Sequence, residues 1–210
     1  MASLVLVRHG QSEWTAQGLW TGWRDVPRSP EGIAEARRAG ELLRDIPFDI
    51  AYTSALTRAQ QTLEEIKRVL GREDLPTVTD PALNERDYGD LTGKNKWKIL
   101  EEYGEEQFLK WRRSWDYPVP GGETLKDVYA RVVPYYQREI LPQLREGRNV
   151  LIAAHGNSLR ALVKYLENIP DDEISKLEIG TGEVYVYQVD PQGRIVSKEI
   201  RAVNPNRGRQ

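Results

Sequence analysis

The chain has 210 residues, 30% of them charged, and a formal net charge of −2 at pH 7. This length allows a substantial buried core and predicts one domain over residues 1–210, while a charge so close to zero predicts neither a nucleic-acid partner nor a membrane partner. The absence of cysteine excludes disulfides, thiolate metal sites and cysteine nucleophiles. Since no apolar stretch is long enough for a secretion signal or a membrane span, we expect a cytoplasmic protein.

Strand and helix patterns alternate along the chain. Leu4–Val7 and Val150–Ala154 are short continuous apolar runs, typical of strands covered on both faces of a parallel sheet, and Asp49–Ser54 is a third candidate strand. Between these runs, Ser29 and Ser54 are each predicted to cap a helix with one apolar face. Strand–helix alternation predicts an α/β fold with a mostly parallel sheet.

The second half is more varied. We expect a helix from about Thr124 to Glu146, bent or segmented at Pro134 and Pro142, and another from about Ser158 to Glu167. Two apolar runs around Asp190 predict a hairpin. Residues 84–122 are predicted to form an irregular insertion over one edge of the sheet, and the polar residues 201–210 a mobile tail.

The two histidines, His9 and His155, share one local pattern. Each follows an apolar strand-like run and precedes a glycine, Gly10 or Gly156. Ligands of open parallel sheets bind at the carboxyl ends of the strands, so we expect both imidazoles at that edge, where glycine allows the backbone to approach a ligand closely.

Arginines and helix starts add positive charge near the same edge. Ser12 and Ser158 are predicted helix caps, and a helix N-terminus favours an anion. Arg8 precedes His9 directly, and Arg58 lies in the first turn of the helix after the third strand. Because guanidinium groups bind phosphate in a bidentate way, imidazoles among arginines indicate phosphoryl chemistry.

The same residues allow other interpretations. A single histidine at a strand end is more often structural than catalytic. A metal site usually needs three protein ligands, and two histidines without cysteine or an HExxH pattern argue against one, so we expect no metal. The chain has no GxxxxGK[ST] loop, kinase motif set or GxSxG motif.

The segment "LVLVRHGQSEW" (Leu4–Trp14) resembles the phosphohistidine signature of the histidine phosphatase superfamily, and more narrowly that of the cofactor-dependent phosphoglycerate mutases. The segments "TGWRDVPRSPEG", "YTSALTRAQQT", "LNERDYGDLTGKNK", "WRRSWD" and "LIAAHGNSLRALVKYLE" follow in the family's order and cover most of the chain. RHG alone is moderately specific, whereas the whole series is highly specific. The resemblance implies a three-layer α/β/α sandwich with a mostly parallel central sheet and helices on both faces.

The resemblance also implies an activity. The chain would interconvert 2-phosphoglycerate and 3-phosphoglycerate through a phosphohistidine, with 2,3-bisphosphoglycerate as phosphoryl primer and no metal. A broad-specificity histidine phosphatase is the alternative, and a non-catalytic scaffold ranks third. The oligomeric state stays open, with a homo-oligomer as one option.

Carried over residue by residue, the resemblance implies that His9 is the nucleophile and Glu85 the general acid/base. Arg8, Arg58 and His155 would surround the phosphoryl group. The implied substrate-binding residues are Gln11, Ser12, Thr21, Gly22, Arg86, Tyr88, Lys96, Arg112, Arg113, Gly156 and Asn157.

Several details are expected around these residues. Nearby arginines should favour the neutral form of His9, whose second ring nitrogen should donate to a backbone carbonyl. Thr15 stands where the family usually has asparagine, which alters one polar contact. Asp87 is an extra carboxylate beside Glu85 that could weaken anion binding. Trp14, Trp20, Trp23 and Trp97 are interpreted as packing residues.

Overall fold

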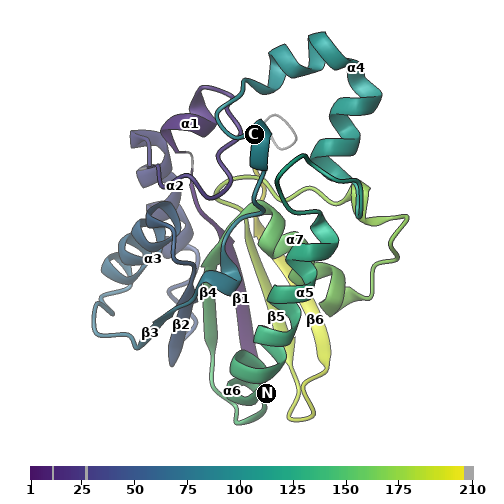
Figure 1. The fold of residues 1–210 in the computed structure, drawn as a ribbon. Helices are drawn as coiled ribbons and strands as arrows, with labels where there is room; N and C mark the ends of the chain where they lie inside the picture. Colours follow the sequence, from purple (N-terminus) through teal and green to yellow (C-terminus); the bar gives the residue numbers. More distant parts are fainter. Residues whose placement is uncertain (11, 27, 206–210) are drawn as a thin grey trace.

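The computed structural model describes residues 1–10, 12–26 and 28–205, which fold around a six-stranded sheet in the order β3-β2-β4-β1-β5-β6 (Figure 1). The strands are β1 (Ala2–Arg8), β2 (Ile50–Thr53), β3 (Thr77–Thr79), β4 (Val150–Ala154), β5 (Val184–Val189) and β6 (Ile195–Ala202). The first four strands are mutually parallel, whereas β5 runs antiparallel to β1 and β6 antiparallel to β5. The sheet is therefore mostly parallel, as predicted.

Helices cover both faces of this sheet. The α-helices are α1 (Glu13–Ala16), α2 (Pro30–Glu41), α3 (Thr57–Val69), α4 (Lys96–Arg113), α5 (Leu125–Tyr135), α6 (Leu141–Arg145) and α7 (Gly156–Glu167). Short turns of 3₁₀-helix are η1 (Pro81–Leu83), η2 (Gly89–Leu91) and η4 (Ile174–Lys176), and η3 (Tyr136–Ile140) is a π-helical turn.

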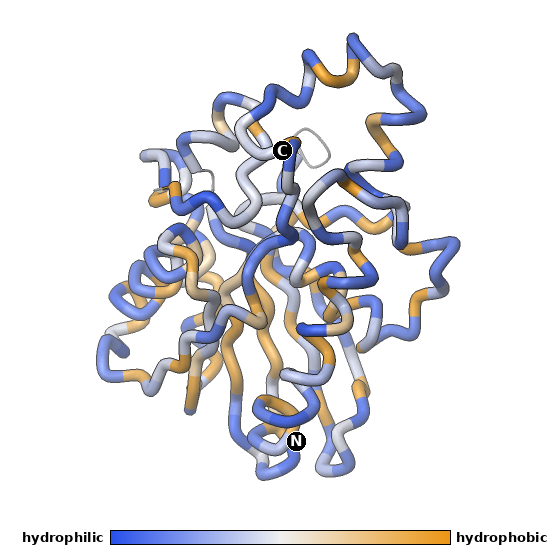
Figure 2. The backbone as a smooth tube through the Cα atoms, viewed as in Figure 1, coloured by the Kyte–Doolittle hydropathy of each residue, from blue (hydrophilic) through white to orange (hydrophobic). Residues whose placement is uncertain are grey.

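Alternation along β1 explains the three layers. Val5 and Val7 point to the face covered by α2 and α3, and Leu4 and Leu6 point to the face covered by α5, α6 and α7. Both faces are apolar, and Figure 2 shows the hydrophobic colour concentrated in the central strands. The predicted three-layer α/β/α sandwich is confirmed.

The register of the central strands brings the two histidines together. β1 pairs with β4 in parallel, with Arg8 opposite Ala154, so His9 and His155 both follow the carboxyl-terminal ends of neighbouring central strands. The N–H of His9 donates to the carbonyl of Ala154 at 2.9 Å, which extends the ladder by one more bond. The prediction that both imidazoles lie at one carboxyl edge is confirmed.

The predicted helix caps hold in two of four cases. Ser29 caps α2 by accepting the N–H of Gly32, and Ser12 caps the short α1. The other two serines are not caps. α3 begins at Thr57, and the hydroxyl of Ser54 instead contacts a histidine side chain. α7 begins at Gly156, so Ser158 lies in its first turn, where its Oγ accepts the N–H of His155.

The long helix predicted from Thr124 is segmented as expected. Thr124 and Asp127 form a reciprocal capping box at the start of α5. Pro134 lies within α5, the π-helical turn η3 follows, and Pro142 lies in the first turn of α6. Proline removes a backbone donor, which accounts for the break.

The interval 84–122 differs from the prediction of irregular structure. It contains η2 and the 18-residue α4, which bends at Gly104, where φ is +85°. α4 stands above the carboxyl ends of the strands rather than beside the sheet (Figure 1). Its Phe108 packs with Trp20 and Tyr88 in a third apolar cluster, which fastens this cap to the rest of the fold.

The carboxyl-terminal hairpin is confirmed, but the predicted mobile tail begins too early. Arg201 and Ala202 are the last residues of β6, and Arg201 forms an ion pair with Asp45 at 2.6 Å. Residues 206–210 lie outside the described part of the chain. Within the described residues, no helix is long and apolar enough to cross a membrane.

Candidate active site

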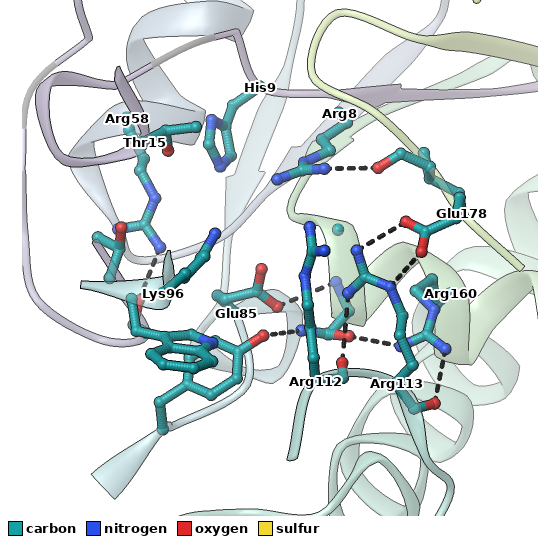
Figure 3. A pocket seen from close by; sticks show the side chains of 17 residues that line it. Arg8, His9, Thr15, Arg58, Glu85, Lys96, Arg112, Arg113, Arg160 and Glu178 are labelled. Atoms are coloured by element: carbon teal, nitrogen blue, oxygen red, sulfur yellow. Dashed lines mark hydrogen bonds and ion pairs between the residues drawn. The ribbon is translucent and has the colours of Figure 1, made fainter. Parts of the chain in front are cut away.

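A pocket opens at the carboxyl ends of β1 and β4, beneath α4 (Figure 3). It is lined by Arg8, His9, Thr15, Trp20, Thr21, Gly22, Arg58, Glu85, Tyr88, Lys96, Arg112, Arg113, Gly156, Asn157, Arg160, Glu178 and Ile179. Cationic side chains dominate this lining, which favours an anionic ligand.

The ring of His9 is held by a backbone carbonyl. Its Nδ1 lies 2.6 Å from the carbonyl oxygen of Gly10, and because a carbonyl only accepts, Nδ1 carries the proton and Nε2 keeps its lone pair. Burial, and then the charges of Arg58 and Arg8, hold the pKa of His9 well below its ordinary value. The predicted neutral form and backbone partner are confirmed, although burial contributes more than the arginines.

His155 meets His9 edge-on. The ring centroids are 5.0 Å apart, with 64° between the ring planes. Nε2 of His155 lies 2.7 Å from Oγ of Ser54. Burial, then the charge of Arg58, holds the pKa of His155 well below its ordinary value, so both imidazoles are neutral.

Two arginines flank the histidines. Arg8 donates from NH1 to the carbonyl of Ile179, and a β-carbon at Gly156 would lie 3.1 Å from its Cζ, so a larger residue there would require the guanidinium to shift. Arg58 donates to the carbonyls of Arg24 and Gly22, and burial lowers its pKa to about 10. Both groups remain cations at neutral pH.

Glu85 lies in the same pocket and is almost fully buried. Its Oε1 accepts the backbone N–H groups of Arg86 at 2.8 Å and of Asn157 at 3.0 Å. The side-chain amide of Asn157 donates to the hydroxyl of Tyr88 at 2.7 Å. These bonds connect the loop before η2 to the first turn of α7 and fix the carboxylate.

A second group of cations comes from the two ends of α4. Lys96 is its first residue, and Arg112 and Arg113 are its last, so the bend at Gly104 allows both ends to reach one pocket. Burial, then the charge of Arg112, holds the pKa of Lys96 well below its ordinary value. Burial lowers the pKa of Arg112 to about 9. The pocket thus has cations at its far end as well as around the histidines.

Comparison with known proteins agrees with this geometry. Residues 4–200 match the model of the histidine phosphatase superfamily (branch 1). The chain is 54% identical to a 2,3-bisphosphoglycerate-dependent phosphoglycerate mutase of Mesorhizobium japonicum, over 94% of this chain and 97% of the relative. A relative of the same name from Methylobacterium sp. is 55% identical, over 94% and 96%. The chain belongs to the 2,3-bisphosphoglycerate-dependent phosphoglycerate mutase family of the histidine phosphatase superfamily.

Solved structures of the superfamily have the same fold. A mycobacterial glucosyl-3-phosphoglycerate phosphatase in complex with VO3 superposes with a TM-score of 0.80 at 26% identity, covering 97% of this chain and 99% of that one. Bacillus stearothermophilus YhfR superposes with a TM-score of 0.81 at 28% identity, covering 97% and 96%. The predicted mutase-like fold is confirmed.

Most site residues implied by the mutase-family resemblance line the pocket, and three of the described ones, His155, Ser12 and Arg86, do not. The ring of His155 lies 5.0 Å from that of His9, measured between centroids. Ser12 is buried and its Oγ lies 2.8 Å from Oγ1 of Thr15, which itself lines the pocket in place of the family's asparagine. Arg86 is fully buried, and its NH1 and NH2 have no hydrogen-bond partner among the described residues. Gln11 lies outside the described residues.

The extra carboxylate of Asp87 is not among the residues that line this mutase-family pocket. Its Oδ1 accepts the backbone N–H of Gly89 at 2.9 Å, within its own loop. The expectation that Asp87 opposes anion binding therefore finds no support in its contacts.

Family motifs did not reveal two charged lining residues, Arg160 and Glu178. Arg160 is a fully buried guanidinium that donates to the carbonyls of Leu177, Arg113 and Ile174, and burial lowers its pKa to about 9. Its position within the apolar pattern of α7 was a usable signal, because a buried charge needs partners.

The buried neutral histidines of this family member predict a pH-dependent stability. The pKa of each histidine is lower in the folded than in the unfolded state, so the two groups do not reduce the free energy of unfolding above pH ~6.5. Below that pH, protons bind the imidazoles of the unfolded state, and the free energy of unfolding falls by up to about 1.4 kcal/mol per pH unit for each histidine. Urea unfolding between pH ~7 and ~5 measures this slope. The double variant His9→Gln, His155→Gln should lose much of it; an unchanged slope would contradict the assignment.

Proposed function

We propose that the chain is an isomerase that interconverts 2-phosphoglycerate and 3-phosphoglycerate in the cytoplasm, through a phosphohistidine at His9. The observation that carries the proposal is the placement of two neutral imidazoles, 5.0 Å apart, of which His9 lines a pocket with cations at both ends. The names of relatives more than half identical to the chain support it as well.

The His9 end of the pocket is suited to phosphoryl transfer. The lone pair of Nε2 attacks phosphorus, a N–P bond forms, and the bond from phosphorus to the leaving oxygen breaks. Arg8 and Arg58 lie beside His9 and stabilise the negative charge of the equatorial oxygens. Since neutral His9 needs no prior deprotonation, the nucleophile is ready at neutral pH.

The contacts of Ser54 indicate how His155 assists. Oγ of Ser54 accepts the N–H of Leu56 at 3.1 Å and lies 2.7 Å from Nε2 of His155, so this hydroxyl holds the second imidazole in place. We assign to His155 a hydrogen bond to the transferring phosphoryl group, strongest in the transition state.

Glu85 is the proposed general acid/base. It protonates the substrate oxygen that leaves phosphorus and takes the proton from the hydroxyl that later attacks phospho-His9. The two backbone N–H groups that bind its Oε1 hold the carboxylate in place for both steps.

The far end of the pocket distinguishes a mutase from a phosphatase. Lys96, Arg112 and Arg113 fit a second anionic group, which a phosphatase of simple phosphate esters does not need. The same cations fit 2,3-bisphosphoglycerate, which when bound supplies the phosphoryl group that first loads His9. By holding the non-transferring end and excluding water, they favour return of the phosphoryl group to a hydroxyl of the same skeleton.

A coupled assay tests the proposal. Purified protein should convert 3-phosphoglycerate to 2-phosphoglycerate once 2,3-bisphosphoglycerate is present, with kcat/KM far above that for hydrolysis of p-nitrophenyl phosphate. Absence of isomerisation would exclude a mutase, and equal turnover of unrelated phosphate esters would favour the phosphatase.

Arg112→Gln tests the second cation group. The variant is expected to lower kcat/KM for isomerisation about 30-fold, because a charge-assisted contact to the non-transferring anion is lost. Hydrolysis of p-nitrophenyl phosphate, which has no second anion, should change less than about threefold in the same preparation. Equal losses in both reactions would mean that Arg112 serves the fold rather than the substrate.

A further inference from the structure

Three consecutive residues, 177–179, each accept a hydrogen bond from a different arginine of the pocket. The pairs are Arg160 with the carbonyl of Leu177, Arg113 with the carboxylate of Glu178, and Arg8 with the carbonyl of Ile179. Two of the acceptors are backbone groups, so Glu178 alone among the three adds a formal charge. This carboxylate has no part in the proposed reaction.

Glu178 holds Arg113 in a bidentate ion pair. Nε of Arg113 lies 2.5 Å from Oε1 and NH2 lies 2.6 Å from Oε2, while NH1 donates to the carbonyl of Arg112. Arg160 donates to the carbonyl of Arg113 at 3.0 Å and fixes the end of α4. All three guanidinium nitrogens of Arg113 thus have a protein partner before any substrate binds.

The carboxylate is charged at neutral pH. Burial raises the pKa of Glu178, but the hydrogen bonds from Arg113 and the charges of Arg113, Arg112 and Arg160 outweigh burial and leave the pKa below its ordinary value. Among the described lining residues, Glu85 and Glu178 are the two carboxylates. Figure 3 shows Glu178 beside Arg113 and Arg160, on the side of the pocket away from Arg58.

We propose that Glu178 is a specificity-determining residue that limits the negative charge accepted at the far end of the pocket. The proposal rests on the mutase function. On the unphosphorylated enzyme, a monophosphoglycerate whose phosphate lies beside His9 brings a carboxylate and a hydroxyl to the far end, whereas 2,3-bisphosphoglycerate brings a carboxylate and a second phosphate. Since Coulomb repulsion scales with ligand charge, Glu178 opposes the bisphosphate more than the monophosphate.

The consequence is a balance between two ligands of one site. The bisphosphate has to bind well enough to load His9 but must also turn over or leave. Glu178 neutralises Arg113 and fixes the orientation of its guanidinium. The remaining N–H groups of Arg113 can then donate to the carboxylate of the substrate without adding net attraction for a second dianion.

Calorimetric titration of the His9→Ala protein tests this inference, because that variant leaves both ligands intact. Glu178→Gln keeps an oxygen acceptor but removes the charge. We expect it to lower the dissociation constant of 2,3-bisphosphoglycerate about tenfold and that of 3-phosphoglycerate less than about threefold. The measured quantity is the ratio of the two dissociation constants. An unchanged ratio, or equal changes for both ligands, would overturn the inference.

Matched variants separate charge from structure. Glu178→Asp keeps the charge and should leave the ratio of the two dissociation constants at the value of the parent. Glu178→Ser removes the charge with a smaller side chain, in case the amide variant folds poorly. Glu65→Gln is the control, because Glu65 of α3 is another buried carboxylate, paired with Arg37 of α2 and Arg68 of α3. If the His9→Ala parent binds neither ligand, the proposed function fails; if it binds both at an unaltered ratio, only the role of Glu178 fails.

Discussion

Replacement of His9 by alanine is expected to abolish phosphoenzyme formation and to lower kcat/KM for isomerisation about 10⁴-fold or more. The reason is chemical, because the nucleophilic Nε2 is removed and His155, though 5.0 Å away, has its own Nε2 engaged with Ser54. Mass spectrometry of intact protein after brief exposure to 2,3-bisphosphoglycerate measures the added phosphoryl group, and fragmentation locates it.

His155→Ala is the informative comparison. It removes a donor to the phosphoryl group but leaves the nucleophile, so we expect slower loading, by about 10²-fold, with the label still on His9. A phosphorylated His9→Ala protein, or a label on His155 in the wild type, would contradict the assignment of nucleophile and helper.

The central strands were predictable because burial on both faces leaves a strong pattern. β4 was predicted residue for residue from "VLIAA", and α2 from the cap at Ser29. β3 was not predicted, since Thr77–Thr79 is short, exposed and pairs with β2 only at the sheet edge. α4 was missed because Gly104 interrupts its pattern, and both halves pack on a small separate cluster.

The site was predictable where the signal is local in sequence. A histidine before a glycine at a strand end is such a signal, and two of them gave the convergence of His9 and His155. Ser54 was assigned to a helix cap because its partner, His155, lies 101 residues away. Glu178 gave no signal at all, since its partner Arg113 is 65 residues distant and lies on the helix that sequence reasoning missed. The roles of such residues depend on partners that are distant in sequence, and no local sequence pattern identifies those partners.

Gly10→Ala is expected to lower the free energy of unfolding by about 3 kcal/mol and kcat/KM about 100-fold. A β-carbon at Gly10 would lie 2.6 Å from Cα of Gly32 and 2.9 Å from its carbonyl carbon, at the start of α2. Backbone cannot move aside as a flexible side chain does, so the turn must shift. The carbonyl of Gly10 holds Nδ1 of His9, so the shift displaces the nucleophile as well. Urea unfolding and the coupled assay measure the two effects.

Gly147→Ala separates this steric cost from ordinary backbone strain. Gly147 has a φ of +83° and open space around its missing β-carbon, so alanine there should cost only about 1 kcal/mol of stability and leave kcat/KM unchanged. Comparable stability losses at the two positions would mean that the contact with Gly32 relaxes easily. A stable Gly10→Ala protein with full activity would show that the position of His9 does not depend on this turn. The contact between Gly10 and Gly32 would then have no role in catalysis.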